Sequence, residues 1–119
     1  MYQIEFYEDE KGISPVWDWL EKLRERSSTN KTARIEFNQS SLYIQLLSQN
    51  GTIMSENYTK YLHDDIWELR PGNNRILYFF LNNTFVLLHQ FRKKTQKTPT
   101  REIAKAVSEM NDYLKRSKE

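Results

Sequence analysis

Two apolar stretches, separated by a short segment that contains two asparagines, constrain the fold of this chain more than any other feature. Residues 75–81 read Arg-Ile-Leu-Tyr-Phe-Phe-Leu and residues 85–91 read Phe-Val-Leu-Leu-His-Gln-Phe. Asn82-Asn83 between them is typical of a tight turn, because asparagine tolerates a left-handed backbone. Strands that are almost continuously apolar are usually covered on both faces. The sequence therefore predicts a central hairpin with other elements packed on each side.

Shorter segments predict further strands. The alternation between Tyr2 and Glu8 is typical of an edge strand, and residues 60–63 and 66–70 predict two more. The turn at residues 71–74, Pro-Gly-Asn-Asn, connects the last of these to the hairpin.

Three segments have helical periodicity. Ser14-Pro15 predicts a helix start, because serine can cap and proline suits the first helical position. After a polar break, a second helix ends at Asn50-Gly51, where a left-handed residue is needed. A third begins at Thr98-Pro99. The apolar residues expected to face inward are Val16, Trp17, Leu20 and Leu23 in the first helix, Ile35, Leu42, Leu46 and Leu47 in the second, and Ile103, Val107, Met110 and Leu114 in the third.

This order of elements predicts the fold class. Strand, two helices, four strands and a helix form an α+β domain with a mostly antiparallel sheet packed against two N-terminal helices. We expect a single domain over residues 1–119.

Composition narrows the kind of protein. The absence of cysteine excludes a disulfide framework, a Cys-ligated zinc and a thiol nucleophile. We expect no signal peptide, and no apolar run approaches the ~18–20 residues that span a membrane. His63 beside Asp64-Asp65 is a weak metal signal, and three isolated glycines cannot build a phosphate-binding loop. We expect a cytoplasmic protein without metal or cofactor and without membrane contact.

Charge is distributed unevenly along the chain. Residues 1–58 contain 6 Lys/Arg and 9 Asp/Glu, a balance of −3, whereas residues 59–119 contain 12 and 7, a balance of +5. A basic half indicates an anionic partner, either nucleic acid or an acidic protein segment, although many small soluble domains are mildly basic.

Arg70 and Arg75 flank the four-residue turn. They should lie opposite each other on one sheet face, where like charges destabilise a strand pair by a few tenths to ~1 kcal/mol. Glu68 shares that face. Two interpretations stay open: the arginines bind a phosphate, or they stand at an exposed strand end, where they are solvated or paired with Glu68.

The segment from Arg92 to Arg101 contains five basic residues and no acidic one. It enters a helix N-terminus, whose free N–H groups and partial positive charge suit a phosphate; a solvated basic loop is the alternative. His89, on the strand before it, is either a buried structural residue or a group that transfers a proton or stacks on a base.

Two stretches of the chain resemble a known family. Residues 60–71, Lys-Tyr-Leu-His-Asp-Asp-Ile-Trp-Glu-Leu-Arg-Pro, with Asn-Arg-Ile-Leu-Tyr-Phe at 74–79, resemble the HigB-type branch of the RelE toxins, including its phage-derived relatives. That branch has a strand ending in Glu-Leu-Arg, a short turn and an arginine that opens the next strand. Residues 85–99 are also similar to it. The resemblance covers most of the chain, and residues 14–50 carry little of it.

The resemblance implies a RelE-like fold and the toxin of a type II toxin–antitoxin system. Such a toxin is an endoribonuclease that cuts mRNA, often on the ribosome, and inhibits translation. The implied partner is a HigA-like antitoxin with a helix-turn-helix domain. The toxin would contact operator DNA only through this antitoxin. By position, Arg75 matches the strand-opening arginine and Arg70 the arginine of Glu-Leu-Arg.

The expected chemistry is in-line attack of a ribose 2′-OH on the adjacent phosphate, without a metal. Arg75 and Arg70 would bind that phosphate, and Lys93, Lys94 or His89 would stabilise charge or move a proton. The expected RNA-binding residues are Arg92, Lys97, Arg101 and Lys60. The alternatives are a non-catalytic RNA- or ribosome-binding translation inhibitor, and an inactive prophage-derived module that binds an antitoxin.

Overall fold

The computed structural model describes residues 1–117, and it confirms the predicted α+β class with a mostly antiparallel sheet. Element boundaries differ from the predicted ones by one or two residues, which is usual at frayed ends. The elements are β1 (Gln3–Phe6), α1 (Pro15–Arg26), α2 (Lys31–Asn50), the short 3-10 helix η1 (Gly51–Ile53), β2 (Thr59–His63), β3 (Ile66–Leu69), β4 (Asn74–Leu81), β5 (Thr84–Arg92) and α3 (Thr100–Ser117).

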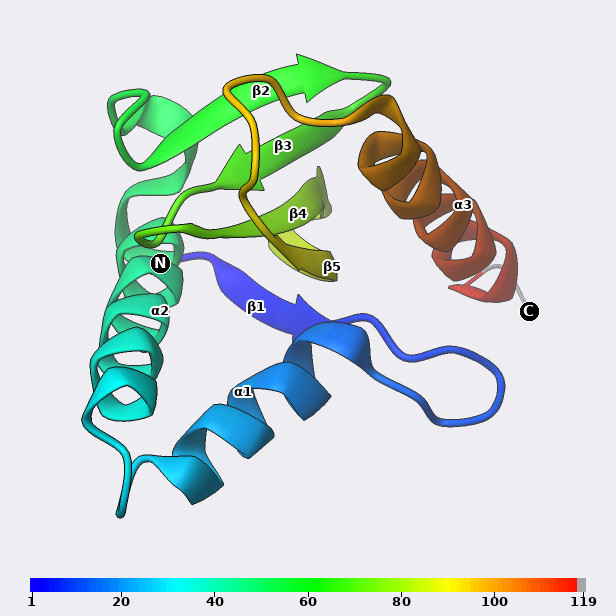
Figure 1. Cartoon of the computed structure of the whole chain (residues 1–119). Helices are drawn as coiled ribbons and strands as arrows, with labels where there is room; N and C mark the ends of the chain where they lie inside the picture. The colour runs from blue at the N-terminus through cyan, green and yellow to red at the C-terminus, as the bar shows by residue number, and fades with distance from the viewer. Residues whose placement is uncertain (118–119) are drawn as a thin grey trace.

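The five strands form one sheet in the order β1-β5-β4-β3-β2 (Figure 1). The hairpin of β4 and β5 is central, as predicted, and β1 is an edge strand, as predicted. β1 runs parallel to β5, with Gln3 opposite Thr84, whereas all other neighbours are antiparallel. Asn82 and Asn83 form the predicted turn with φ of 49° and 61°, and Asp64 and Asp65 form a similar turn between β2 and β3.

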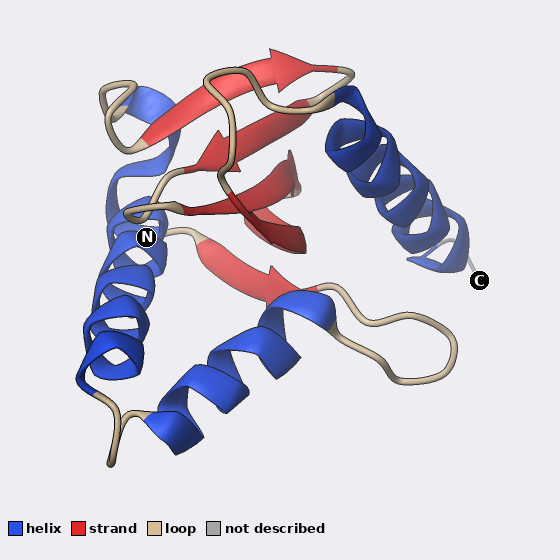
Figure 2. Cartoon of the chain, viewed as in Figure 1, coloured by secondary structure: helices blue, strands red, loops and turns tan. Residues whose placement is uncertain are grey.

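Helices cover both faces of the sheet, so the core has two layers (Figure 2). Alternation along the strands sends neighbouring side chains to opposite faces. On the α3 face the buried core includes Ile66, Leu77, Phe79, Val86, Leu88, Ile103, Ala106 and Met110. On the α1 and α2 face it includes Val16, Leu20, Leu47, Leu69, Ile76, Tyr78, Phe85 and Leu87.

The predicted inner face of α2 was partly wrong. Ile35 is 54% exposed and Leu42 is 49% exposed, whereas Leu47 is buried as expected and Leu46 is half-buried. The stripe that packs on the sheet has the 3–4 spacing of a helix face, and residues two positions away from it point to solvent. That stripe consists of Ala33, Phe37, Ser40, Ile44 and Leu47.

The start of α1 also differs from the prediction. Ser14 occupies the N-cap position, but its side chain makes no cap hydrogen bond and its hydroxyl donates to the Tyr7 carbonyl at 2.7 Å. Trp17 was expected to face inward, yet it is 49% exposed and its ring contacts Phe6 edge-on at 5.1 Å. Asn30 caps α2 by accepting from the Ala33 N–H at 3.0 Å. Ser14 thus ties the start of α1 to Tyr7, the residue after β1, instead of capping the helix.

Within residues 1–117, no helix combines the length and apolar character needed to cross a membrane.

Candidate nucleic-acid interface

A buried carboxylate, that of Glu68, lies at the centre of the predicted arginine cluster. The β3–β4 register pairs Leu69 with Ile76, so Arg70 and Arg75 face each other one position beyond it. Glu68 is only 1% exposed. Its Oε1 lies 3.0 Å from Arg70 Nε and 3.7 Å from Arg75 Nε. In this conformation both arginines pair with Glu68, as one of the two interpretations of the sequence predicted. That interpretation also placed them at an exposed strand end, whereas only 24% of the Arg70 side chain and 11% of the Arg75 side chain are exposed.

Arg75 is held in place by the turn that precedes it. Its Nη1 donates to the Gly72 carbonyl at 2.8 Å and to the Asn74 carbonyl at 2.9 Å. Burial lowers the pKa of Arg75 and the charge of Arg70 adds to this effect, while Glu68 opposes it. A guanidinium still keeps its proton in a protein, so Arg75 is a fixed, partly desolvated positive charge.

The segment between β5 and α3 covers this cluster. Figure 1 shows it crossing over β4 and β3 toward β2 before α3 begins. At its start the Lys93 N–H donates to the Asn73 carbonyl at 2.7 Å, and near its end the Thr98 hydroxyl donates to Glu68 Oε2 at 2.5 Å. Residues 93–99, Glu68 and Arg75 enclose about 10 Å³, which is room for about one water molecule. A phosphate therefore reaches Arg75 only if this segment moves.

An open groove lies beside the closed cluster, between β2 and the start of α3. Its volume is about 290 Å³, and Lys60, His63, Arg70 and Lys97 contribute to its wall. Among the described residues, no carboxylate lines it. Lys60 Nζ lies 3.5 Å from Oε1 of Glu56, which does not line the groove. Arg70 belongs to both the groove and the cluster, so it links an accessible basic surface to the largely buried side chain of Arg75.

The structure thus brings together six of the nine candidate residues. Arg70, Arg75, Lys93, Lys94 and Lys97 line the closed cavity or the groove, and Lys60 lines the groove.

The other three candidates lie outside these two walls. His89 Nε2 is 3.0 Å from Glu102 Oε1 of α3, and both side chains are largely buried. Arg92 Nη1 pairs with Glu36 Oε1 of α2 at 2.8 Å, on the opposite face of the sheet. Arg101 is exposed on the first turn of α3. As a consequence, His89 does not touch the arginine cluster in this conformation.

Arg92 belongs to a separate polar network. Glu36 also accepts from Asn74 Nδ2 at 2.9 Å, and Asn74 Oδ1 accepts from Gln90 at 3.1 Å. The hydrogen bond from Asn74, followed by the contacts with Arg92, lowers the pKa of Glu36 despite its partial burial. This network joins α2 to the ends of β4 and β5, which is a structural role.

Sequence reasoning missed Thr98 as a contact of the cluster. Thr98 was expected only to mark a helix start, and its hydroxyl instead binds Glu68, 30 residues earlier. No local sequence pattern predicts a hydrogen bond between residues so far apart in the chain. His63, which was considered only as a weak metal ligand, lines the groove, and its Nδ1 lies 2.9 Å from Asp64 Oδ2.

The fold and the site define a small α+β domain with an arginine–glutamate cluster and an adjoining basic groove. A family model described as phage-derived protein Gp49-like (DUF891) matches residues 18–111. The chain belongs to this family, which is RelE-like and toxin-like, so the protein is a toxin-like module. No curated protein matches the chain. The expected resemblance to phage-derived relatives of the RelE toxins is supported at the level of this family, and the narrower HigB assignment stays a prediction.

Proposed function

We propose that this protein is the toxin of a type II toxin–antitoxin system, an mRNA endoribonuclease that acts in the cytoplasm and inhibits translation and growth. The observation that carries the proposal is the groove of about 290 Å³, which has Lys60, Arg70 and Lys97 in its wall and no carboxylate among the described residues. A groove with several cations suits the regularly spaced phosphates of single-stranded RNA. The toxin-like family supports the same conclusion.

The proposed reaction is attack of a ribose 2′ oxygen on the adjacent phosphorus. The 2′-OH gives up its proton, the O2′–P bond forms, the P–O5′ bond breaks, and the departing 5′ oxygen takes a proton. The products are a 2′,3′-cyclic phosphate and a 5′-OH. Arg75 and Arg70 would bind the phosphate in place of Glu68, because a planar guanidinium matches two phosphate oxygens. Cations at this position stabilise the developing negative charge without a metal.

This reaction requires the covering segment to move. The hydrogen bond from Thr98 to Glu68 must break before a phosphate can approach Arg75. Lys93 and Lys94 lie on the same segment and are the candidates for stabilising charge or protonating the leaving oxygen. His89, paired with Glu102, is the second candidate for proton transfer.

The proposal is tested by Arg75→Lys, which keeps the charge and removes the planar fork. We expect cleavage of RNA by the purified variant to be about 10²–10³-fold slower, as for the loss of one hydrogen-bond donor to a transition state. The matched control is Arg24→Lys on the exposed face of α1, which should cut at the wild-type rate. Circular dichroism establishes that both variants are folded. A folded Arg75→Lys protein with the wild-type rate contradicts the site assignment.

A second function is a translation inhibitor that binds RNA or the ribosome without cutting. The closed cavity of about 10 Å³ around Arg75 favours it, because no phosphate fits there in this conformation. Mapping RNA 5′ ends after induction separates the two functions: new discrete ends support the nuclease, and growth arrest with intact RNA supports the binder. Growth that continues when the protein is expressed alone indicates an inactive module.

The proposed partner is a HigA-like antitoxin with a helix-turn-helix domain. We expect co-expression of a small helix-turn-helix protein encoded beside this gene to restore growth, and the complex, not the toxin alone, to bind operator DNA. Growth arrest that persists despite co-expression argues against that partner.

A further inference from the structure

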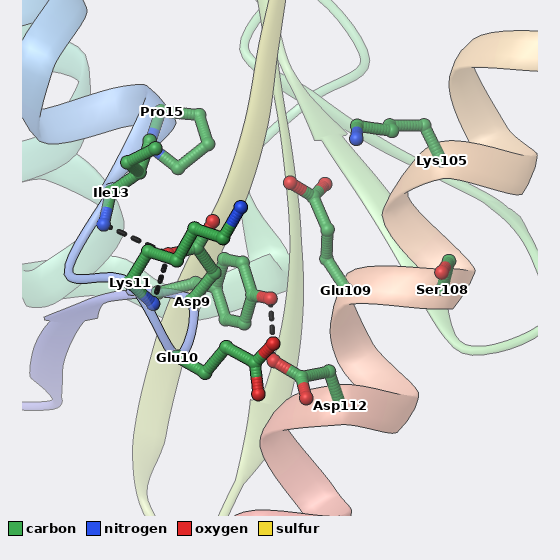
Figure 3. Close-up of a pocket in the computed structure, with 10 residues that line it drawn as sticks. Asp9, Glu10, Lys11, Ile13, Pro15, Lys105, Ser108, Glu109 and Asp112 are labelled. Atoms are coloured by element: carbon green, nitrogen blue, oxygen red, sulfur yellow. Dashed lines mark hydrogen bonds between the residues drawn. The ribbon is translucent and has the colours of Figure 1, made fainter.

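A second cavity, of about 540 Å³, lies between the loop after β1 and the middle of α3. Figure 3 shows its wall, which opens between the loop residues and the helix. Its charged residues are Asp9, Glu10, Glu109, Asp112, Lys11 and Lys105. Four carboxylates and two lysines make this surface acidic, whereas the groove at the start of α3 is basic.

Glu109 is the residue of this cavity that lacks a partner. It is 6% exposed, and its Oε1 has no hydrogen-bond donor among residues 1–117. Figure 3 shows its carboxylate extending from α3 into the space that faces the loop. Buried polar atoms in folded proteins are nearly always hydrogen-bonded, so an orphaned carboxylate oxygen calls for a ligand.

Two neighbouring carboxylates, those of Asp9 and Asp112, have partners already. Asp9 Oδ1 accepts from the backbone N–H groups of Lys11 and Ile13, both at 2.9 Å, and so shapes the loop. Asp112 Oδ2 accepts from the Tyr7 hydroxyl at 2.6 Å and pairs with Arg116 at 2.9 Å. These bonds organise the wall, and Glu109 remains a buried carboxylate without a donor to its Oε1 among residues 1–117.

We propose that this cavity binds an organic cation, a guanidinium or ammonium group, with Glu109 as its buried ligand and Glu10 at its mouth. The cavity volume lies within the roughly 300–1,000 Å³ of ligand pockets. A guanidinium offers five N–H donors and an ammonium offers three, and these can reach carboxylates on two sides of the cavity. A metal ion does not fit, because no three His, Cys, Asp or Glu side chains of residues 1–117 are arranged to hold one.

Protonation of Glu109 should control this binding. Burial raises its pKa to about 7, and Asp9 acts in the same direction while Lys105 opposes it. A bound cation favours the ionised carboxylate, so affinity should fall as the pH drops below about 7. The titratable groups that face Glu109 are Tyr7, Asp9, Glu10 and Lys11 from the segment after β1, and Lys105 and Asp112 from α3.

The test is a titration of the full chain at pH 8, followed by ¹H–¹⁵N NMR. The two probes are agmatine, a free organic cation, and the capped peptide acetyl-Gly-Arg-Gly-amide, which presents an arginine side chain as a protein partner would. We expect saturable shifts confined to residues 9–13 and 105–112. Tighter binding of agmatine identifies a free amine as the ligand, and tighter binding of the peptide identifies a partner's side chain; either result supports the site.

Three variants decide the role of Glu109. Glu109→Gln keeps the shape and should weaken binding at least about tenfold, as expected when a charge-assisted contact becomes neutral. Glu10→Gln, at an exposed position that leaves the fold intact, should weaken it a few-fold, and Glu25→Gln on α1 should leave it unchanged. The wild-type affinity should fall about tenfold or more between pH 8 and pH 5.5. Absence of binding by both probes, or equal binding by wild type and Glu109→Gln, overturns the proposal.

Discussion

Replacing Glu68 with glutamine tests the central claim about the arginine cluster. Glu68 is 1% exposed and holds Arg70 at 3.0 Å, Arg75 at 3.7 Å and the Thr98 hydroxyl at 2.5 Å. Removing one partner from a buried ion pair costs about 3–5 kcal/mol, because the remaining charge stays buried without compensation. Glutamine keeps one acceptor oxygen, and the Arg75 contact is longer than a hydrogen bond. We therefore expect the lower end of that range, a loss of about 3 kcal/mol.

Urea unfolding followed by circular dichroism measures this loss. With a slope of about 1.5 kcal/mol per molar urea, typical of a small domain, a loss of about 3 kcal/mol lowers the unfolding midpoint by about 2 M. The slope itself should not change, since the variant exposes the same surface on unfolding. In the proposed function the variant should also bind single-stranded RNA more tightly, because Arg70 and Arg75 lose their competing carboxylate.

The matched control is Glu21→Gln on α1. Glu21 makes two contacts with Arg24, at 3.1 and 2.8 Å, but on the surface. Such exposed pairs contribute little to stability, so its unfolding midpoint should match the wild type. If Glu68→Gln unfolds at the wild-type urea concentration or above it, the desolvation of Glu68 outweighs its pairing. The Glu68 carboxylate then does not stabilise the fold through the two partly buried arginines.

Three further changes test other parts of the fold. Because the pKa of Glu109 is raised to about 7, the native state keeps a proton that the unfolded chain loses above about pH 4.5, and the free energy of unfolding should fall between pH 4.5 and 7. In urea unfolding, Glu109→Gln should therefore be more stable than wild type by roughly 2 kcal/mol at pH 8 and equal to it at pH 4. Gly51→Ala adds a Cβ 2.9 Å from Tyr2 Cε2 at a φ of 66° and should lower the free energy of unfolding by about 2 kcal/mol or more. In the control Gly12→Ala, the nearest contact of the new Cβ is 3.7 Å away, so only the left-handed backbone strain, about 1 kcal/mol, should lower the free energy of unfolding. Equal losses in the two variants would show that Tyr2 moves aside. Tyr78→Phe removes a buried hydroxyl 2.6 Å from Thr59 Oγ1 and should lower stability by about 1–2 kcal/mol, and an unchanged thermal midpoint would mean that this bond contributes nothing.

Strand patterns predicted the sheet well because strand signals are local. The apolar stretches of β4 and β5 and the asparagine turn between them correctly indicated the central hairpin. The parallel pairing of β1 with β5 has no local signal, since it joins Gln3 to Thr84 across most of the chain. The inner face of α2 was missed because Ile35 and Leu42 are apolar and Ser40 is polar, yet Ser40 is buried and the other two are exposed.

The candidate site was predictable only in part. The opposition of Arg70 and Arg75 and the place of Glu68 followed from strand alternation and turn length, so local rules were enough. The pairing of His89 with Glu102 and of Arg92 with Glu36 depends on how helices pack on the sheet. Those contacts determine which basic residues are available to a ligand, and the spacing of residues along the chain does not predict them.

The closed cluster has an energetic consequence for any anionic ligand. Opening it breaks the hydrogen bond from Thr98 to the Glu68 carboxylate, and bonds to charged groups contribute about 1.5–3 kcal/mol each. If opening has this cost, the open state is populated at roughly 1–10%, and the apparent affinity for a phosphate at Arg75 is reduced by the same factor. The groove with Lys60 and Lys97 needs no such opening. In the proposed function, an RNA strand would therefore bind first in the groove, and its contacts there would offset the cost of exposing Arg75.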